Sequence, residues 1–234
     1  MQNQHISAVS NSPGLDIILG PMFSGKSTEL IRILSTATHV NLKALYINHS
    51  LDKRNSDSVF STHAGHIKKV PDLVNLNMCS VSNLNEIDDS LLDEVSVIGI
   101  DEGQFFEDLS PIMKWIEEKN KRVVIVSLDG DYKRGVFGHV LEYIPKCDSV
   151  RKLHSLCMRC AVKKNIIPAL FTHKLSIEKK TVSSHPPSSP SPSSSPPSSP
   201  SPSANNDIEQ IVDVGSGDKY ESVCRSCYIY YTNQ

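Results

Sequence analysis

The sequence predicts an α/β protein in which a mostly parallel sheet is followed by a small lobe held together by cysteines. Apolar runs of strand length alternate with stretches of helical periodicity up to about residue 150, which is typical of βα units. Beyond that point the apolar segments are short, and four of the six cysteines form two C-x-x-C pairs. The chain of 234 residues is long enough to bury a sizeable core.

The expected elements follow one another along the chain. Strands are predicted at residues 15–19, 44–47, 95–100 and 123–128, with a helix after residue 27 and another within 109–119. In the second helix Ile112, Trp115 and Ile116 share one face. Around the cysteine pairs, residues 169–172 and 228–231 are predicted as small strands.

Composition divides the chain further. Residues 1–14 are expected to form a disordered tail, 15–150 the sheet domain and 151–234 the lobe, which a disordered insertion at 183–205 interrupts. Residues 183–203 consist of 12 Ser, 8 Pro and one His, too little apolar surface to offset the entropy of ordering. The insertion is either an inert spacer or a set of Ser-Pro phosphorylation sites.

Charge and hydropathy exclude several classes of protein. With 24 Lys and Arg against 26 Asp and Glu, the chain lacks the basicity that nucleic-acid binding is built on. It also has no apolar run near the roughly 20 residues of a membrane span. The N-terminal segment resembles neither a secretion signal nor a transit peptide, so a cytoplasmic location is expected.

Residues 20–27 read GPMFSGKS and match the phosphate-binding motif G-x-x-x-x-G-K-[ST]. In this motif main-chain N–H groups surround the phosphates, the lysine reaches the β and γ oxygens, and the last hydroxyl contacts Mg²⁺. A predicted strand before the motif and a helix after it favour a nucleoside triphosphate site over a structural turn. The predicted loop residues are Gly20, Pro21, Met22, Phe23, Ser24, Gly25, Lys26 and Ser27.

Two carboxylates follow the strand predicted at 95–100. Asp101 is expected at the carboxyl edge of the sheet, where it can hold the Mg²⁺ shell directly or through water. Glu102 can accept a proton from a nucleophile. If the nucleophile is water the protein is an ATPase, and if it is a hydroxyl of a bound molecule the protein is a kinase.

These segments together resemble the cytosolic (type II) thymidine kinase family. The resemblance rests on GPMFSGKSTEL at 20–30, DEGQFF at 101–106, LDGDY at 128–132, Phe137-Gly138, both C-x-x-C pairs and DKY at 218–220. It covers residues 15–231 apart from the Ser/Pro insertion. It implies a P-loop kinase domain that uses ATP with Mg²⁺ to phosphorylate the 5′-hydroxyl of thymidine, and also of deoxyuridine. Family members form tetramers and are inhibited by the end product, thymidine triphosphate.

The resemblance also implies roles for individual residues. Glu102 is the general base, and Ser27, Asp52 and Asp101 form the magnesium shell. The ATP site comprises the loop residues above with Thr28, Asp52, Lys53, Arg54, Asp101 and Gln104. The nucleoside site comprises Met22, Phe105, Tyr132, Phe137, Thr172, Ile211, Val212, Asp213, Val214, Gly215 and Tyr220. Tyr132 stands where the family pattern has Phe. The run at 211–215 resembles the lid loop that closes over the nucleoside.

Cys157, Cys160, Cys224 and Cys227 provide four thiolates, the composition of a closed, structural zinc site. Two disulfides are disfavoured in a reducing compartment. Such a zinc ribbon would hold both arms of the lid, because a lobe this small cannot build its own core. The segment between Cys160 and Cys224 is much longer than in the family pattern. Cys79 and Cys147 are expected to be buried thiols outside the site.

Three other functions remain as alternatives. A P-loop ATPase could use the zinc ribbon to bind nucleic acid, which the net charge of −2 disfavours. A GTP switch would need an [NT]-K-x-D motif that the sequence lacks. A catalytically inactive homologue is disfavoured because Lys26, Ser27, Asp101 and Glu102 are all present. Neither nucleic acid nor membrane is expected as a partner.

Overall fold

The computed structural model describes residues 12–52, 59–60, 68–69, 75–175 and 219–232. Several predictions lie outside these residues: most of the N-terminal tail, Lys53, Arg54, the insertion at 183–205 and the lid loop at 211–215.

A six-stranded sheet with strand order β5-β2-β6-β7-β1-β8 forms the centre of the molecule, and all of its neighbouring strands are parallel. Its strands are β1 (Gly14–Leu19), β2 (Ala44–His49), β5 (Leu76–Val81), β6 (Val97–Ile100), β7 (Arg122–Ser127) and β8 (Ser149–Lys152). A separate short ladder joins β3 (Val59–Phe60) and β4 (Lys68–Lys69). The predicted α/β fold with a mostly parallel sheet is confirmed.

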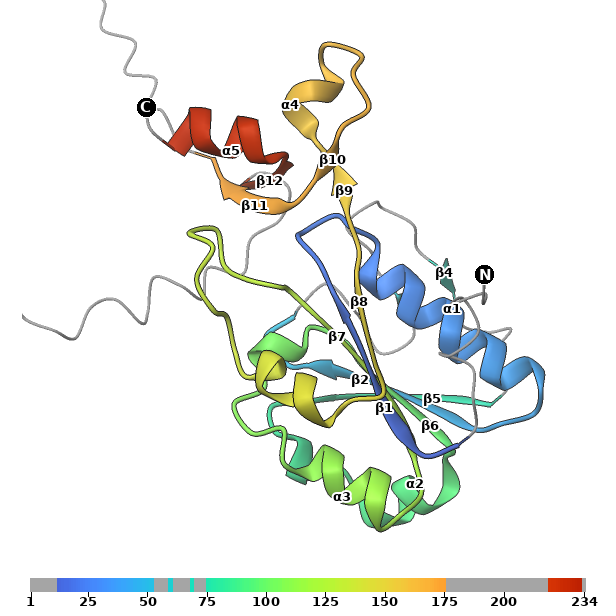
Figure 1. Cartoon of the computed structure of the whole chain (residues 1–234). Coiled ribbons are helices and arrows are strands. Elements are labelled where there is room, and N and C mark those ends of the chain that lie inside the picture. The colour runs from blue at the N-terminus through green and yellow to red at the C-terminus, as the bar shows by residue number, and fades with distance from the viewer. Residues whose placement is uncertain (1–11, 53–58, 61–67, 70–74, 176–218, 233–234) are drawn as a thin grey trace, which may run out of the picture.

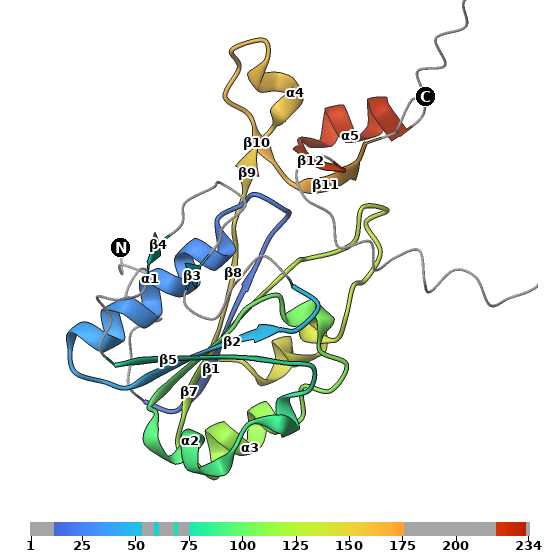
Figure 2. The same ribbon diagram turned by 180° about the vertical axis from the view of Figure 1, so that it is seen from behind.

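Helices cover both faces of this sheet (Figures 1 and 2). Helix α1 (Lys26–His39) packs on one face, where Leu30 and Leu34 meet Ile18, Tyr46 and other residues of alternate strand positions. Helices α2 (Asp89–Glu94) and α3 (Pro111–Glu117) lie on the other face, against Ile17 and the remaining alternate positions. The continuous apolar runs predicted from the sequence therefore reflect strands buried on both sides.

The two edge strands were not among the strands predicted from the sequence. In β8 half-buried and exposed residues alternate, and β5 contains no fully buried residue. Such strands lack the continuous apolar run that marks the central ones. Strand β8 spans residue 150, the predicted boundary between the domain and the lobe.

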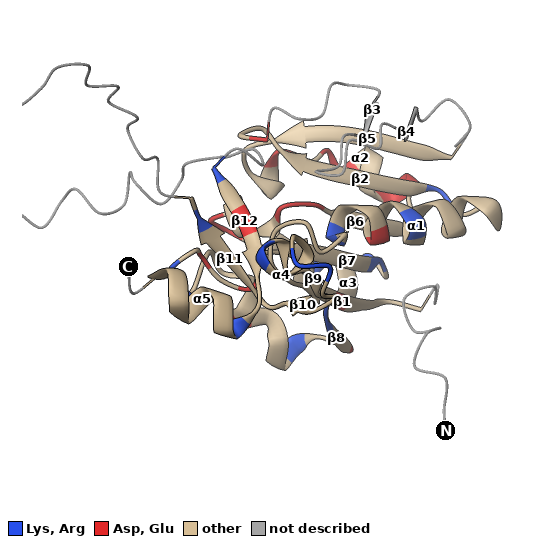
Figure 3. Ribbon diagram, turned by 90° about the horizontal axis from the view of Figure 1, so that it is seen from above, with Lys and Arg blue, Asp and Glu red and all other residues tan. Residues whose placement is uncertain are grey.

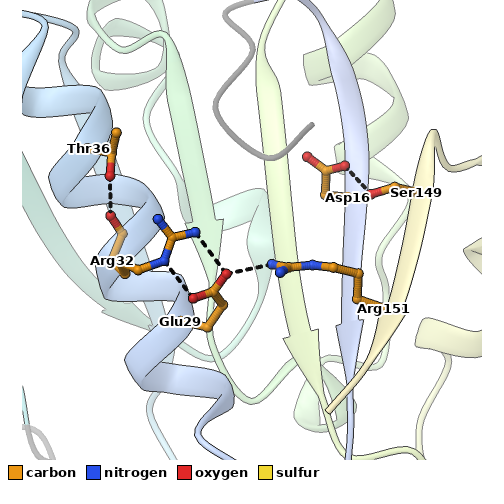
Figure 4. Close-up of polar contacts among 6 residues, drawn as sticks. All are labelled: Asp16, Glu29, Arg32, Thr36, Ser149 and Arg151. Carbon is orange, nitrogen blue, oxygen red and sulfur yellow. Dashed lines mark hydrogen bonds and ion pairs between the residues drawn. The ribbon is translucent and has the colours of Figure 1, made fainter. Parts of the chain in front are cut away.

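Polar side chains link β8 to α1 on one side and to β1 on the other (Figure 4). Glu29 of α1 accepts hydrogen bonds from Arg32 on the same helix and from Arg151 of β8, at 2.7 and 2.8 Å. Within the sheet, buried Asp16 accepts a hydrogen bond of 2.9 Å from Arg122 Nε and another from Ser149.

The lobe begins at β9. It lies beyond the carboxyl ends of the parallel strands, on the side where β1 leads into the phosphate loop (Figures 1 and 2). It contains β9 (Ser155–Leu156), α4 (Met158–Ala161), β10 (Pro168–Ala169), β11 (Phe171–Lys174), β12 (Tyr220–Val223) and α5 (Arg225–Thr232). Strands β11 and β12 pair in antiparallel fashion, although 45 residues separate them in the sequence. No helix in the described part of the chain is long and apolar enough to cross a membrane.

The prediction of a strand at 228–231 is wrong, because these residues belong to helix α5. The helix starts within the second C-x-x-C pair, where the Tyr228 N–H donates to the Cys224 carbonyl at 2.9 Å. This turn brings Cys224 and Cys227 to the same place, and it buries Tyr228 while Tyr230 is exposed. The requirement that both thiols face one site thus prevails over the β-propensity of the aromatic residues.

Candidate active site

The phosphate loop connects β1 to α1, and two of its side chains bond to one carbonyl within the loop. Lys26 Nζ and Ser24 Oγ both donate to the Pro21 carbonyl, at 2.9 and 2.8 Å. Phe23 and Gly25 adopt left-handed backbone conformations, with φ of 62° and 83°. A Cβ atom at Gly20 would lie 2.7 Å from the Leu153 carbonyl oxygen, so only glycine fits there. Thr28, predicted as an ATP contact, is exposed on the first turn of α1.

The carboxyl end of β6 lies directly beside this loop. Ser27 Oγ donates to Asp101 Oδ1 at 3.1 Å, and the hydroxyl of Tyr46 donates to Asp101 Oδ2 at 2.8 Å. The Ser27 hydroxyl is thereby joined to a carboxylate 74 positions away in the sequence. The fold thus brings together two of the residues predicted for the magnesium shell.

Three buried carboxylates gather around the Tyr46 hydroxyl. Burial raises the pKa of Tyr46 well above its ordinary value, and the negative charges of Asp101, Asp52 and Glu102 raise it further. These carboxyl groups are only 2%, 4% and 7% exposed. Oxygen donors of this kind suit Mg²⁺, and a cation would offset the cost of burying their charge. The residues present therefore fit a magnesium ion.

Glu102 is held by both its backbone and its side chain. Its backbone is left-handed, with φ 50° and ψ 45°, and its N–H donates to Asp101 Oδ1 at 2.9 Å. Its carboxylate accepts a hydrogen bond of 2.6 Å from Gln104 Nε2. The amide oxygen of Gln104 in turn accepts from Ser127 Oγ and from the Leu128 N–H, at 3.1 and 3.0 Å.

This arrangement fixes the orientation of the Gln104 amide. Because two donors occupy the amide oxygen, its N–H₂ group faces Glu102. Gln104 was predicted among the ATP contacts, whereas the structure places its side chain on the carboxylate predicted as the base.

The residues predicted for the nucleoside site come together in pairs. The rings of Phe105 and Phe137 meet edge to face with centroids 5.9 Å apart, and those of Tyr132 and Tyr220 lie 6.3 Å apart. The Met22 N–H donates to Thr172 Oγ1 at 3.0 Å. A cavity of about 330 Å³ lies elsewhere, beside α2 and α3, and none of the predicted site residues lines it.

The four cysteines of the C-x-x-C pairs converge in the lobe, and their sulfur atoms all lie within 4.8 Å of one another. Burial opposes ionisation of Cys157, but N–H donors of Cys224 and Cys160 outweigh it and lower its pKa to about 7. The pKa values of Cys160 and Cys227 are raised. Cys160 is shifted mainly by its bond to Cys157, and Cys227 mainly by burial. Four sulfur donors suit zinc, which would favour the thiolate at each of them.

The two remaining cysteines lie outside this cluster, as expected, but they are half-buried rather than buried. Burial raises the pKa of the Cys79 thiol to about 11, so this thiol stays protonated at neutral pH.

Sequence reasoning missed several residues that shape the site. Tyr46, Ser127 and Ser222 are buried hydroxyls that bond to site residues distant in the sequence. His49 donates from Nε2 to the Ser82 carbonyl, accepts from the Leu51 N–H, and packs edge to face on Phe106. Burial lowers the pKa of His49, consistent with a neutral ring that supports the 101–106 segment. No local motif marks any of these positions.

A glycine-rich loop between a strand and a helix, beside a buried acidic strand end, defines a P-loop protein that binds a nucleoside triphosphate. The match to known proteins is more specific. The thymidine kinase family model covers residues 14–228. The chain belongs to the thymidine kinase family.

Individual relatives agree with the family model. Cytosolic thymidine kinase of Bos taurus is 34% identical over 214 residues, which cover 92% of this chain and 71% of the bovine protein. The human cytosolic enzyme is 33% identical over the same length, covering 92% and 72%. Thymidine kinase of Yaba monkey tumor virus is 32% identical over 224 residues, covering 96% and 99%.

Proposed function

We propose that this protein transfers the γ-phosphoryl group of ATP to the 5′-hydroxyl of thymidine, giving thymidine monophosphate and ADP. Besides membership of the family, one structural observation supports this proposal. The hydrogen bond between Ser27 and Asp101 joins the phosphate loop to the strand end that bears Glu102. The site therefore combines a phosphate-binding loop with a buried carboxylate beside it.

The phosphate loop and Lys26 bind the β- and γ-phosphates in this proposal. Ser27, Asp52 and Asp101 would hold Mg²⁺, which would supply positive charge to neutralise the phosphates during transfer. Lys53 and Arg54, outside the described residues, complete the ATP contacts that the family resemblance implies. The Lys26 ammonium at the Pro21 carbonyl is already inside the loop that the phosphates would enter.

Glu102 acts as the general base. It accepts the proton of the 5′-hydroxyl as that oxygen forms a bond to the γ-phosphorus, and the bond between this phosphorus and the oxygen of ADP breaks. Gln104, fixed by Ser127 and Leu128, keeps the carboxylate in place. Such a base contributes a factor of roughly 10²–10⁴, while positioning and charge neutralisation supply the rest.

The nucleoside site is proposed to comprise the aromatic and apolar residues described above, with Thr172 and the lid loop at 211–215. A structural zinc on the four cysteines would hold the lobe that carries this lid. Use of deoxyuridine, tetrameric assembly, inhibition by thymidine triphosphate and a cytosolic location are further proposals that rest on the family.

The alternative of an ATPase that binds nucleic acid through its lobe is not favoured. The described charged residues of the lobe are mostly Lys and Arg, with one acid, Glu221 of β12, among them (Figure 3), but the chain as a whole has 24 basic against 26 acidic residues and matches the thymidine kinase family. Two of its basic residues are also paired with acids or rings: Arg159 with Glu221, and Arg225 over Phe171.

The variant Glu102→Gln tests the proposal. We expect kcat for thymidine phosphorylation to fall by about 10²–10⁴, with thymidine and ATP still bound. Glu107→Gln, an exposed acid on the same segment, serves as the matched control and should retain kcat. If Glu102→Gln stays within a few-fold of the wild type, the assignment of the base is wrong.

A further inference from the structure

The lobe contacts the phosphate loop at the main chain of Met22. Thr172 of β11 and Ser222 of β12 stand directly opposite each other in their ladder, and both hydroxyls reach this residue. The Met22 N–H donates to Thr172 Oγ1 at 3.0 Å, and Ser222 Oγ donates to the Met22 carbonyl. Thr172 is 5% exposed and Ser222 is fully buried. The main chain of Met22 is therefore held by a hydroxyl at both its N–H and its carbonyl.

The two strands that provide these hydroxyls are anchored on the cysteine cluster. Strand β12 ends at Val223, immediately before Cys224, and Val223 packs with Cys157, Cys224 and Tyr228 in the small core of the lobe. Ser222 is thus two residues from a proposed zinc ligand. A lobe fixed at its cysteines can hold Met22 in one position, because the intervening chain is a paired strand rather than a loop.

The position of Met22 matters for phosphate binding. It follows Pro21, whose carbonyl accepts hydrogen bonds from Lys26 and Ser24, and it precedes Phe23, whose backbone is left-handed. A left-handed conformation at a residue other than glycine is unfavourable and persists only where the surroundings impose it. The bonds to Met22 supply such a restraint at the adjoining residue.

We propose that Ser222 and Thr172 are positioning residues that hold the phosphate loop in the conformation that binds ATP. The cysteine lobe then contributes to the nucleotide site as well as to the nucleoside lid. This inference rests on the proposed function for the identity of the nucleotide. It assigns a role to Ser222, which no sequence motif marked, and adds a second role to Thr172, which was predicted only beside the thymine base.

The test measures ATP binding directly, by calorimetric titration of the zinc-loaded protein with ATP and Mg²⁺ in the absence of nucleoside. Ser222→Ala removes the donor to the Met22 carbonyl, and we expect the Kd for ATP to rise by about 5- to 20-fold. Thr172→Val removes the acceptor for the Met22 N–H with little change in shape and should act in the same direction. Thr172→Ser, a separate variant, keeps the hydroxyl, so its Kd for ATP should stay within about twofold of the wild type.

Tyr228→Phe provides a matched control. The Tyr228 hydroxyl also joins the lobe to the sheet domain, through a 2.8 Å bond to the Tyr132 carbonyl, but it does not contact the phosphate loop. We expect this variant to keep the wild-type Kd for ATP. Zinc content and the unfolding temperature, measured for every variant, identify any variant whose lobe has not folded. If Ser222→Ala does not fold, the comparison of Thr172→Val with Thr172→Ser tests the inference on its own.

Three results would overturn the inference: an ATP Kd for Ser222→Ala and Thr172→Val within twofold of the wild type, an equal loss in Tyr228→Phe, or no recovery in Thr172→Ser. A change in Thr172→Val confined to the KM for thymidine would also contradict it, since it would leave that residue a contact of the base alone. A wild-type protein that binds ATP but does not phosphorylate thymidine would refute the proposed function and leave the ATP-binding comparison valid.

Discussion

The sheet domain and the cysteine lobe are stabilised by different means. The sheet domain has two apolar cores, one on each face of a six-stranded sheet. Among the residues of the lobe that the structure describes, the apolar core contains five buried residues, two of which are cysteines of the proposed metal site. The sheet domain therefore owes its stability to apolar burial, whereas we propose that the lobe depends on zinc held by its four cysteines. The site lies where the two meet, so it needs both.

Removal of the proposed zinc should have the largest effect, because it should unfold the lobe and leave the sheet domain native. We expect Cys224→Ser to lose zinc and to lower thymidine phosphorylation by about 100-fold or more, because a displaced lobe no longer positions the substrate groups. Trp115, the single tryptophan of the chain, is buried in the sheet domain and reports on that region alone. Its fluorescence should stay native, and proteolysis should cleave only the lobe.

Cys147→Ser is the matched control for this experiment, since Cys147 is a half-buried thiol outside the cluster. It should keep both zinc and activity. Loss of the native Trp115 signal in Cys224→Ser would show instead that the two regions unfold together.

A second variant should act on the sheet domain as a whole. Asp16 and Arg122 form a buried ion pair between β1 and β7, with side chains only 2% and 6% exposed. We expect Asp16→Asn to lower the free energy of unfolding by about 3 kcal/mol, because the buried Arg122 guanidinium loses its nearest carboxylate and is left with the more distant one of Asp148, at 3.8 Å. Urea unfolding followed by Trp115 fluorescence measures this change.

The exposed pair of Lys43 and Glu94 provides the comparison. Glu94→Gln should change stability by less than about 1 kcal/mol. Equal losses of stability in Asp16→Asn and Glu94→Gln would show that burial does not set the cost of breaking an ion pair in this protein.

A variant of Gln104 should have a smaller effect, and it distinguishes between two roles of this residue: positioning of Glu102 and contact with ATP. Gln104→Met keeps the size of the side chain and removes its hydrogen bond to Glu102, so we expect kcat to fall by about tenfold with both KM values within twofold. Steady-state kinetics in thymidine and in ATP give this split. A raised KM for ATP with an unchanged kcat would instead favour the ATP contact that the sequence resemblance implied.

The smallest expected effect concerns the ion pairs of Glu29. Hydrogen bonds from Arg32, partly opposed by burial, and the charge of Arg151 lower the pKa of Glu29 from 4.5 to about 2. Because the pKa is lower in the folded state, this stabilisation is complete above about pH 4.5 and is lost as the pH falls toward 2. The pair is partly exposed, so the contribution is about 1 kcal/mol or less.

Urea unfolding of the wild type and of Glu29→Gln measures this contribution. The difference in stability between them should shrink as the pH is lowered from about 6 to about 3. A difference that is constant with pH would show that the carboxylate charge contributes nothing.

The sequence predicted those features that local spacing encodes. The phosphate loop, the acidic strand end and the two C-x-x-C pairs each lie within eight or fewer consecutive residues, and the structure forms the expected strand, loop and helix around the loop. The edge strands β5 and β8 were missed because neither has a continuous apolar run: β5 contains no fully buried residue, and β8 alternates half-buried and exposed residues. Helix α5 was mistaken for a strand because its aromatic residues have high β-propensity.

The contacts that hold the site together could not be predicted in this way. Ser222 meets Met22 across 200 positions of sequence, and Tyr46 meets Asp101 across 55. Serine and tyrosine are common residues, and nothing in their immediate neighbours distinguishes these two. Only the register of β11 with β12 and the order of strands in the sheet bring them to the site.

Phosphate transfer from labelled ATP is the direct test of the proposed thymidine kinase activity. The zinc-loaded protein is incubated with ATP and Mg²⁺ and with thymidine, deoxyuridine, deoxycytidine or no nucleoside. We expect labelled thymidine monophosphate far above the control without nucleoside. Hydrolysis of ATP at the same rate in all four reactions, with no labelled nucleoside monophosphate, would contradict it.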